Sequence, residues 1–145
     1  MSNFTPKTII FCCNWCFCTG ADPAEMLDIK PDSNVRLVKT MCSGRIEPSF
    51  IIQAFANGAD GVMVAGCHPG DCHYNSGNYK TMRRLLLLRS TLSQMGIEPE
   101  RLKLVWISTE ETDKFKQSVE EFVTDVAKLG PLDYDKEVRK VATAV

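Results

Sequence analysis

The sequence predicts a single α/β domain built on a parallel four-stranded sheet with helices on both faces, of the flavodoxin-like or Rossmann-like kind. Strand-like and helix-like segments alternate four times along the 145 residues, and this alternation is typical of parallel sheets. The run 62–65 is apolar throughout, as expected of a strand buried on both faces. The domain is expected over residues 1–131, followed by a C-terminal tail, 132–145, that is flexible or bound to a partner.

The first half of the chain contains two predicted strands, over residues 7–12 and 35–41. Between them, Asp22 followed by proline is a good helix start and predicts a short helix over 23–27. A second helix is expected from Pro48 to the Asn-Gly pair that ends at residue 58.

The second half repeats the pattern after the buried strand. A long helix is expected over 79–95, because large apolar residues recur every three or four positions: Leu85, Leu88, Leu92 and Met95. A fourth strand is expected over 102–107, and residues 108–111 (Ser-Thr-Glu-Glu) match a helix capping box. The last helix should end at Gly130, which a proline follows.

Composition excludes several classes of partner. The net charge is −1, so the chain offers no field that would attract nucleic acid or an anionic membrane. No apolar stretch approaches the length of a membrane span, and the N-terminus has no long apolar signal region, so we expect a cytoplasmic protein. Seven cysteines in such a protein indicate metal or redox chemistry more than a disulfide framework.

The cysteines follow the predicted strands. The first strand ends at Cys12 and Cys13, the second is followed by Cys42, and the third by Cys67. Because parallel strands have their carboxyl ends at one edge of the sheet, these thiols are expected to converge there. The candidate metal ligands and cofactor-binding residues are therefore the five best-placed thiols: Cys13, Cys16, Cys42, Cys67 and Cys72.

Cys67 and Cys72 share one short loop with the sequence Cys-His-Pro-Gly-Asp-Cys. Pro69 fixes part of the turn. Gly66 and Gly70 are expected to let the backbone come close to whatever the thiols hold.

Three kinds of site fit these thiols, and we favour the first. Thiolates suit an iron–sulfur cluster, which needs four of them. A structural zinc site is the second alternative, although this domain has enough elements to form a core without zinc. A dithiol redox enzyme using the Cys13-Asn-Trp-Cys16 motif is the third. Cys12 and Cys18 are interpreted as a small buried hydrophobic residue and a spare thiol.

The residues around the thiols indicate an electron carrier that binds a partner protein more than an enzyme with a substrate site. No phosphate loop and no Ser-His-Asp arrangement is recognisable, so an electron carrier is the best interpretation. His68 and His73 are expected to hydrogen-bond near the ligands instead of binding metal. Trp15, Phe17 and Tyr74 are predicted to pack against a partner protein, with shielding of the cluster within one chain as the alternative.

Several motifs resemble one known family. They are Cys13-Asn-Trp-Cys16, 19–22 (Thr-Gly-Ala-Asp), 41–45 (Met-Cys-Ser-Gly-Arg), 61–74 (Gly-Val-Met-Val-Ala-Gly-Cys-His-Pro-Gly-Asp-Cys-His-Tyr), 96–102 (Gly-Ile-Glu-Pro-Glu-Arg-Leu) and 106–108 (Trp-Ile-Ser). In this order they are similar to the delta subunit of methyl-viologen-reducing hydrogenase, over roughly residues 8–131.

The resemblance implies a [2Fe-2S] electron-transfer subunit that is not itself catalytic. Such a subunit passes electrons from the small and large subunits of a [NiFe]-hydrogenase, or from formate dehydrogenase, to the flavin-containing subunit of heterodisulfide reductase. The flavin then performs electron bifurcation in methanogenesis. The family's five cysteines correspond to Cys13, Cys16, Cys42, Cys67 and Cys72, of which a cluster needs four. The chain departs from the family pattern at Cys18, where tyrosine is expected, and Cys12 is an additional thiol.

Overall fold

The computed structural model describes residues 4–16, 25, 27–30 and 33–144, and these contain four strands and four α-helices. The elements run in the order β1 Thr8–Cys13, β2 Val35–Thr40, the 3₁₀ turn η1 Ser43–Arg45, α2 Pro48–Ala56, β3 Gly61–Gly66, α3 Gly77–Gln94, the 3₁₀ turn η2 Pro99–Arg101, β4 Leu102–Trp106, α4 Thr112–Leu129 and α5 Tyr134–Thr143. None of the described helices has the length and apolar composition that crossing a bilayer requires.

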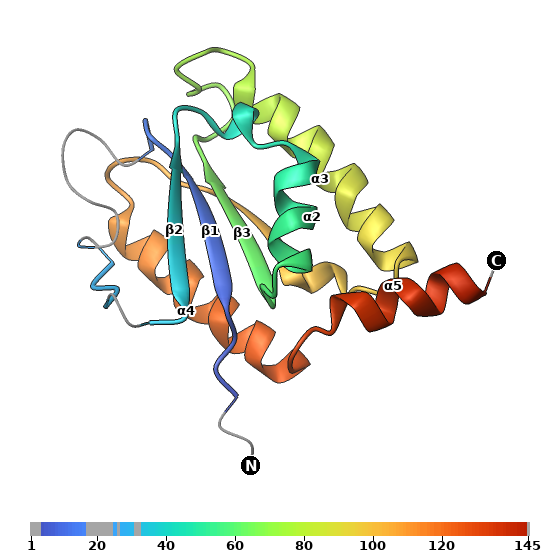
Figure 1. The fold of residues 1–145 in the computed structure, drawn as a ribbon. Coiled ribbons are helices and arrows are strands. Elements are labelled where there is room, and N and C mark those ends of the chain that lie inside the picture. The colour runs from blue at the N-terminus through green and yellow to red at the C-terminus, as the bar shows by residue number, and fades with distance from the viewer. Residues whose placement is uncertain (1–3, 17–24, 26, 31–32, 145) are drawn as a thin grey trace.

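The sheet is parallel throughout and has the strand order β2-β1-β3-β4. This order confirms the predicted α/β class and corresponds to the first four strands of the flavodoxin-like arrangement. Helices α2 and α3 cover one face, and α4 covers the other (Figure 1). The two central strands are buried: every residue of β3 is, and so are five of the six residues of β1.

The two faces of the sheet carry separate cores. Toward α4, Ile10 and Met63 pack against Phe115 and Phe122. Toward α2 and α3, Val62 and Val64 belong to a second cluster that includes Ile51, Phe55, Leu85 and Leu88. The loops that follow β2 and β3 lie together beyond one edge of the sheet, at the top of Figure 1. This edge holds the candidate site.

Most predicted elements are present, but two helix starts differ from the predictions. Helix α3 begins at Gly77, two residues before the expected start. The proposed capping box at 108–111 is present only in part, and α4 begins later than it predicts, at Thr112 with Glu111 as its N-cap. Of the two bonds of the box, the Glu111 carboxylate makes one by accepting the backbone N–H of Ser108 at 2.9 Å. The expected helix 23–27 lies mostly outside the described residues.

The C-terminal segment, for which the sequence predicts no element, contains α5. Asp133 caps this helix by accepting the backbone N–H of Lys136 at 3.1 Å. Leu132 and Tyr134 pack against the core beneath α2 and α3. The Asp60 carboxylate fixes the segment before α5, because it accepts the backbone N–H of Leu132 at 2.9 Å.

Arg101 is the largest fully buried side chain, with 2% of its surface exposed. Its guanidinium donates to the carbonyl oxygens of Asp60 and Gly130, both at 3.0 Å, and to that of Leu129 at 3.4 Å. The Glu98 carboxylate accepts its Nε–H at 2.7 Å. Arg101 therefore joins the start of β3 to the end of α4.

Candidate metal centre

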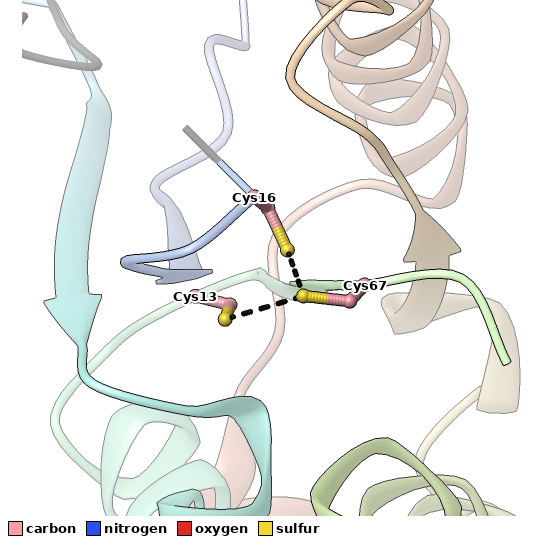
Figure 2. A group of neighbouring side chains, drawn as sticks. All are labelled: Cys13, Cys16 and Cys67. Carbon is pink, nitrogen blue, oxygen red and sulfur yellow. Dashed lines mark hydrogen bonds between the residues drawn. The ribbon is translucent and has the colours of Figure 1, made fainter. Parts of the chain in front are cut away.

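Three buried thiols gather at the carboxyl edge of the two central strands. Cys13 ends β1, Cys16 follows it after one turn, and Cys67 comes directly after β3. The three sulfur atoms lie within 4.8 Å of one another. The Sγ atoms of Cys13 and Cys67 are 3.7 Å apart, and those of Cys16 and Cys67 are 3.2 Å apart (Figure 2).

Strand pairing explains why these residues meet. In the parallel pair of β1 and β3, Cys12 lies opposite Ala65. The two strands therefore end side by side, near Cys13 and Cys67. The backbone N–H of Cys16 donates to the Cys13 carbonyl oxygen at 3.2 Å, which turns Cys16 back over the strand ends.

Two further thiols form a second group beside the first. The Sγ atoms of Cys42 and Cys72 are 3.8 Å apart, and both residues are buried. Cys42 is the N-cap of η1, and its sulfur accepts the backbone N–H of Gly44 at 3.4 Å. The two groups are close enough to interact electrostatically. Burial is the main cause of the raised pKa of Cys42, and the charge of Cys13 raises it further. The edge of the sheet therefore carries two adjacent thiol groups.

Gly77, the first residue of α3, gives this second group its space. A Cβ atom at Gly77 would collide with the Cys42 sulfur and lie 3.1 Å from the Cys72 sulfur. Gly44 packs against the same residue, since its Cβ would lie 2.8 Å from the Gly77 Cα. The glycines that the sequence had indicated act differently: a Cβ at Gly66 would meet Ser43 and Trp106, and one at Gly70 would meet nothing within 4 Å.

A buried amide fixes the other side of the loop. The Asn78 side chain donates from Nδ2 to the carbonyl oxygens of Cys67 and His68, at 3.0 and 2.8 Å. Asn78 is 1% exposed, so these bonds are shielded from water. The start of α3 thus positions Cys67 through Asn78 and the Cys42–Cys72 pair through Gly77.

Without a metal, the thiols of the first group share protons unequally. A hydrogen bond from Cys16 lowers the pKa of Cys13 to about 5. The same bond raises the pKa of Cys16, and burial adds to this effect. Burial also raises the pKa of Cys67, to about 11. Cys13 is therefore the thiolate of this group, and Cys16 is the proton donor.

In the second group, backbone amides favour a thiolate at Cys72. Burial raises the pKa of Cys72, but the N–H groups of Asn78, Tyr74 and Gly77, together with the Cys42 thiol, outweigh it and leave the pKa lowered. Cys42 has a raised pKa, mainly because of its burial. Amides that stabilise a thiolate also stabilise a sulfur bound to a metal.

The donor set fits an iron–sulfur cluster. For a tetrahedral metal with metal–sulfur bonds of about 2.3 Å, two ligand sulfurs lie about 3.8 Å apart. The Cys13–Cys67 and Cys42–Cys72 separations, 3.7 and 3.8 Å, match that spacing, whereas the Cys16–Cys67 separation of 3.2 Å is shorter. Thiolates are the donors that such clusters use.

The other candidates of this edge lie outside the two thiol groups. Cys12 is fully buried, its sulfur donates to the Ile10 carbonyl oxygen at 3.8 Å, and burial raises its pKa to about 12. Cys18 and Phe17 lie outside the described residues. His68 Nε2 is 2.6 Å from the Glu111 carboxylate. His73 stacks on Trp15, with ring centroids 3.7 Å apart.

Three aromatic rings, those of Trp15, His73 and Tyr74, gather from the two loops that carry Cys16 and Cys72. Trp15 stacks on His73 and donates from its indole N–H to the Tyr74 hydroxyl oxygen at 3.4 Å. Tyr74 is 48% exposed and Trp15 is 37% exposed. These rings therefore present apolar surface to the outside.

Sequence reasoning missed Gly77 and Asn78. Both follow Cys72 by only five or six residues, but the expected helix start at residue 79 placed them in a loop. The useful signal was the small Ser-Gly-Asn stretch between the cysteine loop and the apolar helix pattern, since small residues there permit close backbone approach.

Comparison with known proteins agrees with this site. Residues 8–130 match the family described as methyl-viologen-reducing hydrogenase, delta subunit. The iron-sulfur subunit of the F420-non-reducing hydrogenase vhc of Methanococcus voltae is 45% identical over 139 residues, 96% of each chain. The corresponding iron-sulfur subunit of Archaeoglobus profundus is 48% identical over 131 residues, which are 90% of this chain and 96% of that one.

A third relative is much longer than this chain. It is a subunit of the ferredoxin/F(420)H(2)-dependent CoB-CoM heterodisulfide reductase of Methanosarcina acetivorans, and it is 39% identical over 127 residues. The match covers 88% of this chain but 16% of that longer protein. The extent of the family match and the identity to the two full-length relatives show that this chain belongs to the methyl-viologen-reducing hydrogenase delta-subunit family.

Proposed function

We propose that this chain is a cytoplasmic electron-transfer subunit that holds one [2Fe-2S] cluster. In this proposal it passes electrons from a [NiFe]-hydrogenase, or from formate dehydrogenase, to the flavin-containing subunit of heterodisulfide reductase. The flavin subunit would then carry out electron bifurcation in methanogenesis. The observation that carries the proposal is the division of the buried thiols into two adjacent groups, because a binuclear cluster needs two thiolates for each iron.

Geometry suggests which thiols serve as ligands. The pairs Cys13–Cys67 and Cys42–Cys72 each have the separation of two ligands on one tetrahedral metal. Cys16 would be the fifth thiol, held as a hydrogen-bond donor to Cys13. In this assignment Cys13, Cys42, Cys67 and Cys72 bind the cluster. When bound, the cluster supplies reversible one-electron storage.

A single zinc ion fits the arrangement less well. Cys13, Cys16 and Cys67 could surround one ion, but a structural zinc site needs a fourth ligand. Cys42 and Cys72 are paired with each other instead of completing that group. One zinc ion would therefore leave at least one buried thiol of the pair without a metal.

A dithiol enzyme also fits less well. The lowered pKa of Cys13 suits a nucleophilic thiol. However, Cys13 is 2% exposed and Cys16 is 1% exposed, so a disulfide substrate cannot reach either sulfur without movement of the loop. These thiols are buried, so they can bind a metal but cannot react with a large disulfide substrate. Their burial therefore favours an electron carrier over a thiol-exchange enzyme.

The names of the relatives support the choice of partners. Two are iron-sulfur subunits of a hydrogenase, and one belongs to a heterodisulfide reductase. Because the match covers 16% of the reductase protein, that protein carries a domain like this chain within a longer polypeptide. A domain that is fused to the reductase in one protein is expected to work beside the reductase when it is a separate chain.

Anaerobic electron transfer between purified proteins tests this function. The chain is reduced, mixed with the oxidised flavin subunit of heterodisulfide reductase from the same organism, and followed by its visible absorption in a stopped-flow instrument. We expect reoxidation of the chain together with reduction of the flavin. A stable cluster that never exchanges electrons with the flavin subunit would contradict the proposed role.

A further inference from the structure

A shallow groove lies beside Cys42 at the carboxyl edge of the sheet. It has a volume of about 340 Å³, and Cys42 forms part of its wall. Its other lining residues come from the segment after β2, from the loop before α3 and from the first turn of α3, and they include Met41, Arg45, Tyr74, Gly77 and Lys80. The groove therefore borders Cys42, one of the two thiols of the second group.

The charge of this groove has one sign. Arg45 and Lys80 are exposed on its walls, and the described residues that line it include no carboxylate. Neither cation forms an ion pair with a described carboxylate. A third cation lies close by, because Arg84 donates to the Gly44 carbonyl oxygen at 2.7 Å. The groove would attract negative charge.

The groove also exposes apolar surface that a monomer normally hides. Met41 is 56% exposed and Tyr74 is 48% exposed. Trp15 lies against Tyr74, with ring centroids 6.4 Å apart, so the apolar surface extends onto the aromatic rings. Methionine and aromatic residues at the centre with arginine beside them form a composition that is enriched in protein interfaces.

A larger cavity elsewhere lacks this combination. It lies between α4 and the described residues 27–30 and 33–35, and it has a volume of about 580 Å³. Its walls carry charges of both signs, such as Lys116 and Glu120, and no described cysteine lines it. It therefore offers neither a single sign of charge nor a route to the thiols.

We propose that the Cys42 groove is the docking site for an acidic protein surface, whose carboxylates would pair with Arg45 and Lys80 around an apolar contact to Met41 and Tyr74. The site rests on the proposed function, because the partner would be the flavin-containing subunit of heterodisulfide reductase, which receives electrons from the cluster. Docking here would place the partner's redox centre next to the Cys42–Cys72 side of the thiol site. The partner is a protein and not a small anion, because the apolar walls need a surface to cover them.

Charge reversal tests the proposal on the intact, cluster-loaded chain. The variants are Arg45→Glu, Lys80→Glu and the pair together, and the probe is the flavin-containing heterodisulfide reductase protein of the same organism. Lys80 lies in the first turn of α3, where an acidic residue interacts favourably with the helix dipole, so this exchange should not weaken the helix. Arg89→Glu is the matched control, because it makes the same charge change on the exposed side of the same helix.

Binding and cluster content are measured on each sample. We expect each reversal in the groove to raise the dissociation constant about fivefold, and the pair about 25-fold, at low salt and with the visible spectrum unchanged. Arg89→Glu should bind as the unmodified chain does. The difference between the pair and the control should shrink as salt is added, because the ion pairs are exposed.

Each outcome decides the proposal. Unchanged binding of the double variant, or equal losses in the double variant and Arg89→Glu, would overturn it. Citrate can also be added at constant ionic strength as a competitor. If citrate binds in the groove but the variants bind the reductase protein as the unmodified chain does, the groove is a small-anion site and the proposal is overturned. If a groove variant loses the cluster, binding of the matching Gln variant decides. Absence of iron in the unmodified chain would instead refute the proposed function.

Discussion

A methyl group added at Gly77 tests the geometry of the thiol site directly. In Gly77→Ala the new Cβ would collide with the Cys42 sulfur and lie 3.1 Å from the Cys72 sulfur. To restore ordinary contact, the Cys42 sulfur must move by on the order of 1 Å. Metal–ligand distances tolerate a change of only about 0.2 Å. We therefore expect Gly77→Ala to hold little or no cluster.

The fold should survive this change. Overpacking in a core costs about 1–3 kcal/mol, and replacing a helical glycine by alanine returns about 0.5–1 kcal/mol. The net loss is about 1 kcal/mol, which for a domain of this size lowers Tm by about 4 °C. The cluster-free variant should therefore remain folded at room temperature.

The assay compares iron, acid-labile sulfide and visible absorption after anaerobic purification, with Tm measured on the cluster-free protein. Gly58→Ala is the matched control. Gly58 has φ +99°, so alanine there strains the backbone, but its Cβ would meet nothing within 4 Å. We expect a similar loss of Tm and a full cluster in this control. A full cluster in Gly77→Ala would refute the proposed position of the cluster beside α3.

Three further predictions concern individual side chains. Cys16→Ser should keep most of the cluster, whereas Cys72→Ser should lose it, because serine is a poor donor to iron; iron analysis in which Cys16→Ser bleaches and Cys72→Ser stays coloured would reverse our assignment. Arg101→Met should lower the free energy of unfolding by about 3 kcal/mol in urea, since one buried and two partly buried carbonyl oxygens lose their donor; a loss below about 1 kcal/mol would show that water replaces it. The hydrogen bond from His68, followed by that from the Ser108 N–H, lowers the pKa of Glu111 to about 2, so its stabilisation of the cluster-free protein should be complete above about pH 4.5 and lost as the pH falls through about 2. Glu111→Gln should flatten the pH dependence of Tm between about pH 2 and pH 4.5. An unchanged slope would contradict the lowered pKa of Glu111.

The sequence was sufficient to predict which strands bring the cysteines together. Cys13, Cys42 and Cys67 each end or follow a strand, and parallel strands place such residues at one edge regardless of side-chain detail. The two helical layers follow from the same alternation, but alternation does not choose between a flavodoxin-like and a Rossmann-like strand order. These features depend on local patterns, which a single chain displays.

Contacts between distant segments could not be predicted in this way. The role of Gly77 depends on how closely η1 approaches α3, and nothing near residue 77 reveals the Cys42 sulfur. Arg101 looks like a surface residue at a strand start, yet it is buried and donates to carbonyl oxygens before β3 and at the end of α4, two segments far apart in the sequence. Helix α5 was missed although Tyr134, Val138 and Val141 recur at helical spacing, because the segment is short and mostly polar and has no buried residue.

Metal and sulfide analysis of the anaerobically purified chain tests the proposed cofactor most directly. Two thiolates on each of two irons predict about two iron and two sulfide per chain, with a paramagnetic signal after reduction by one electron. The same sample of Cys16→Ser should give the same stoichiometry. Stoichiometric zinc without iron, after strictly anaerobic purification, would contradict the proposed iron–sulfur cluster.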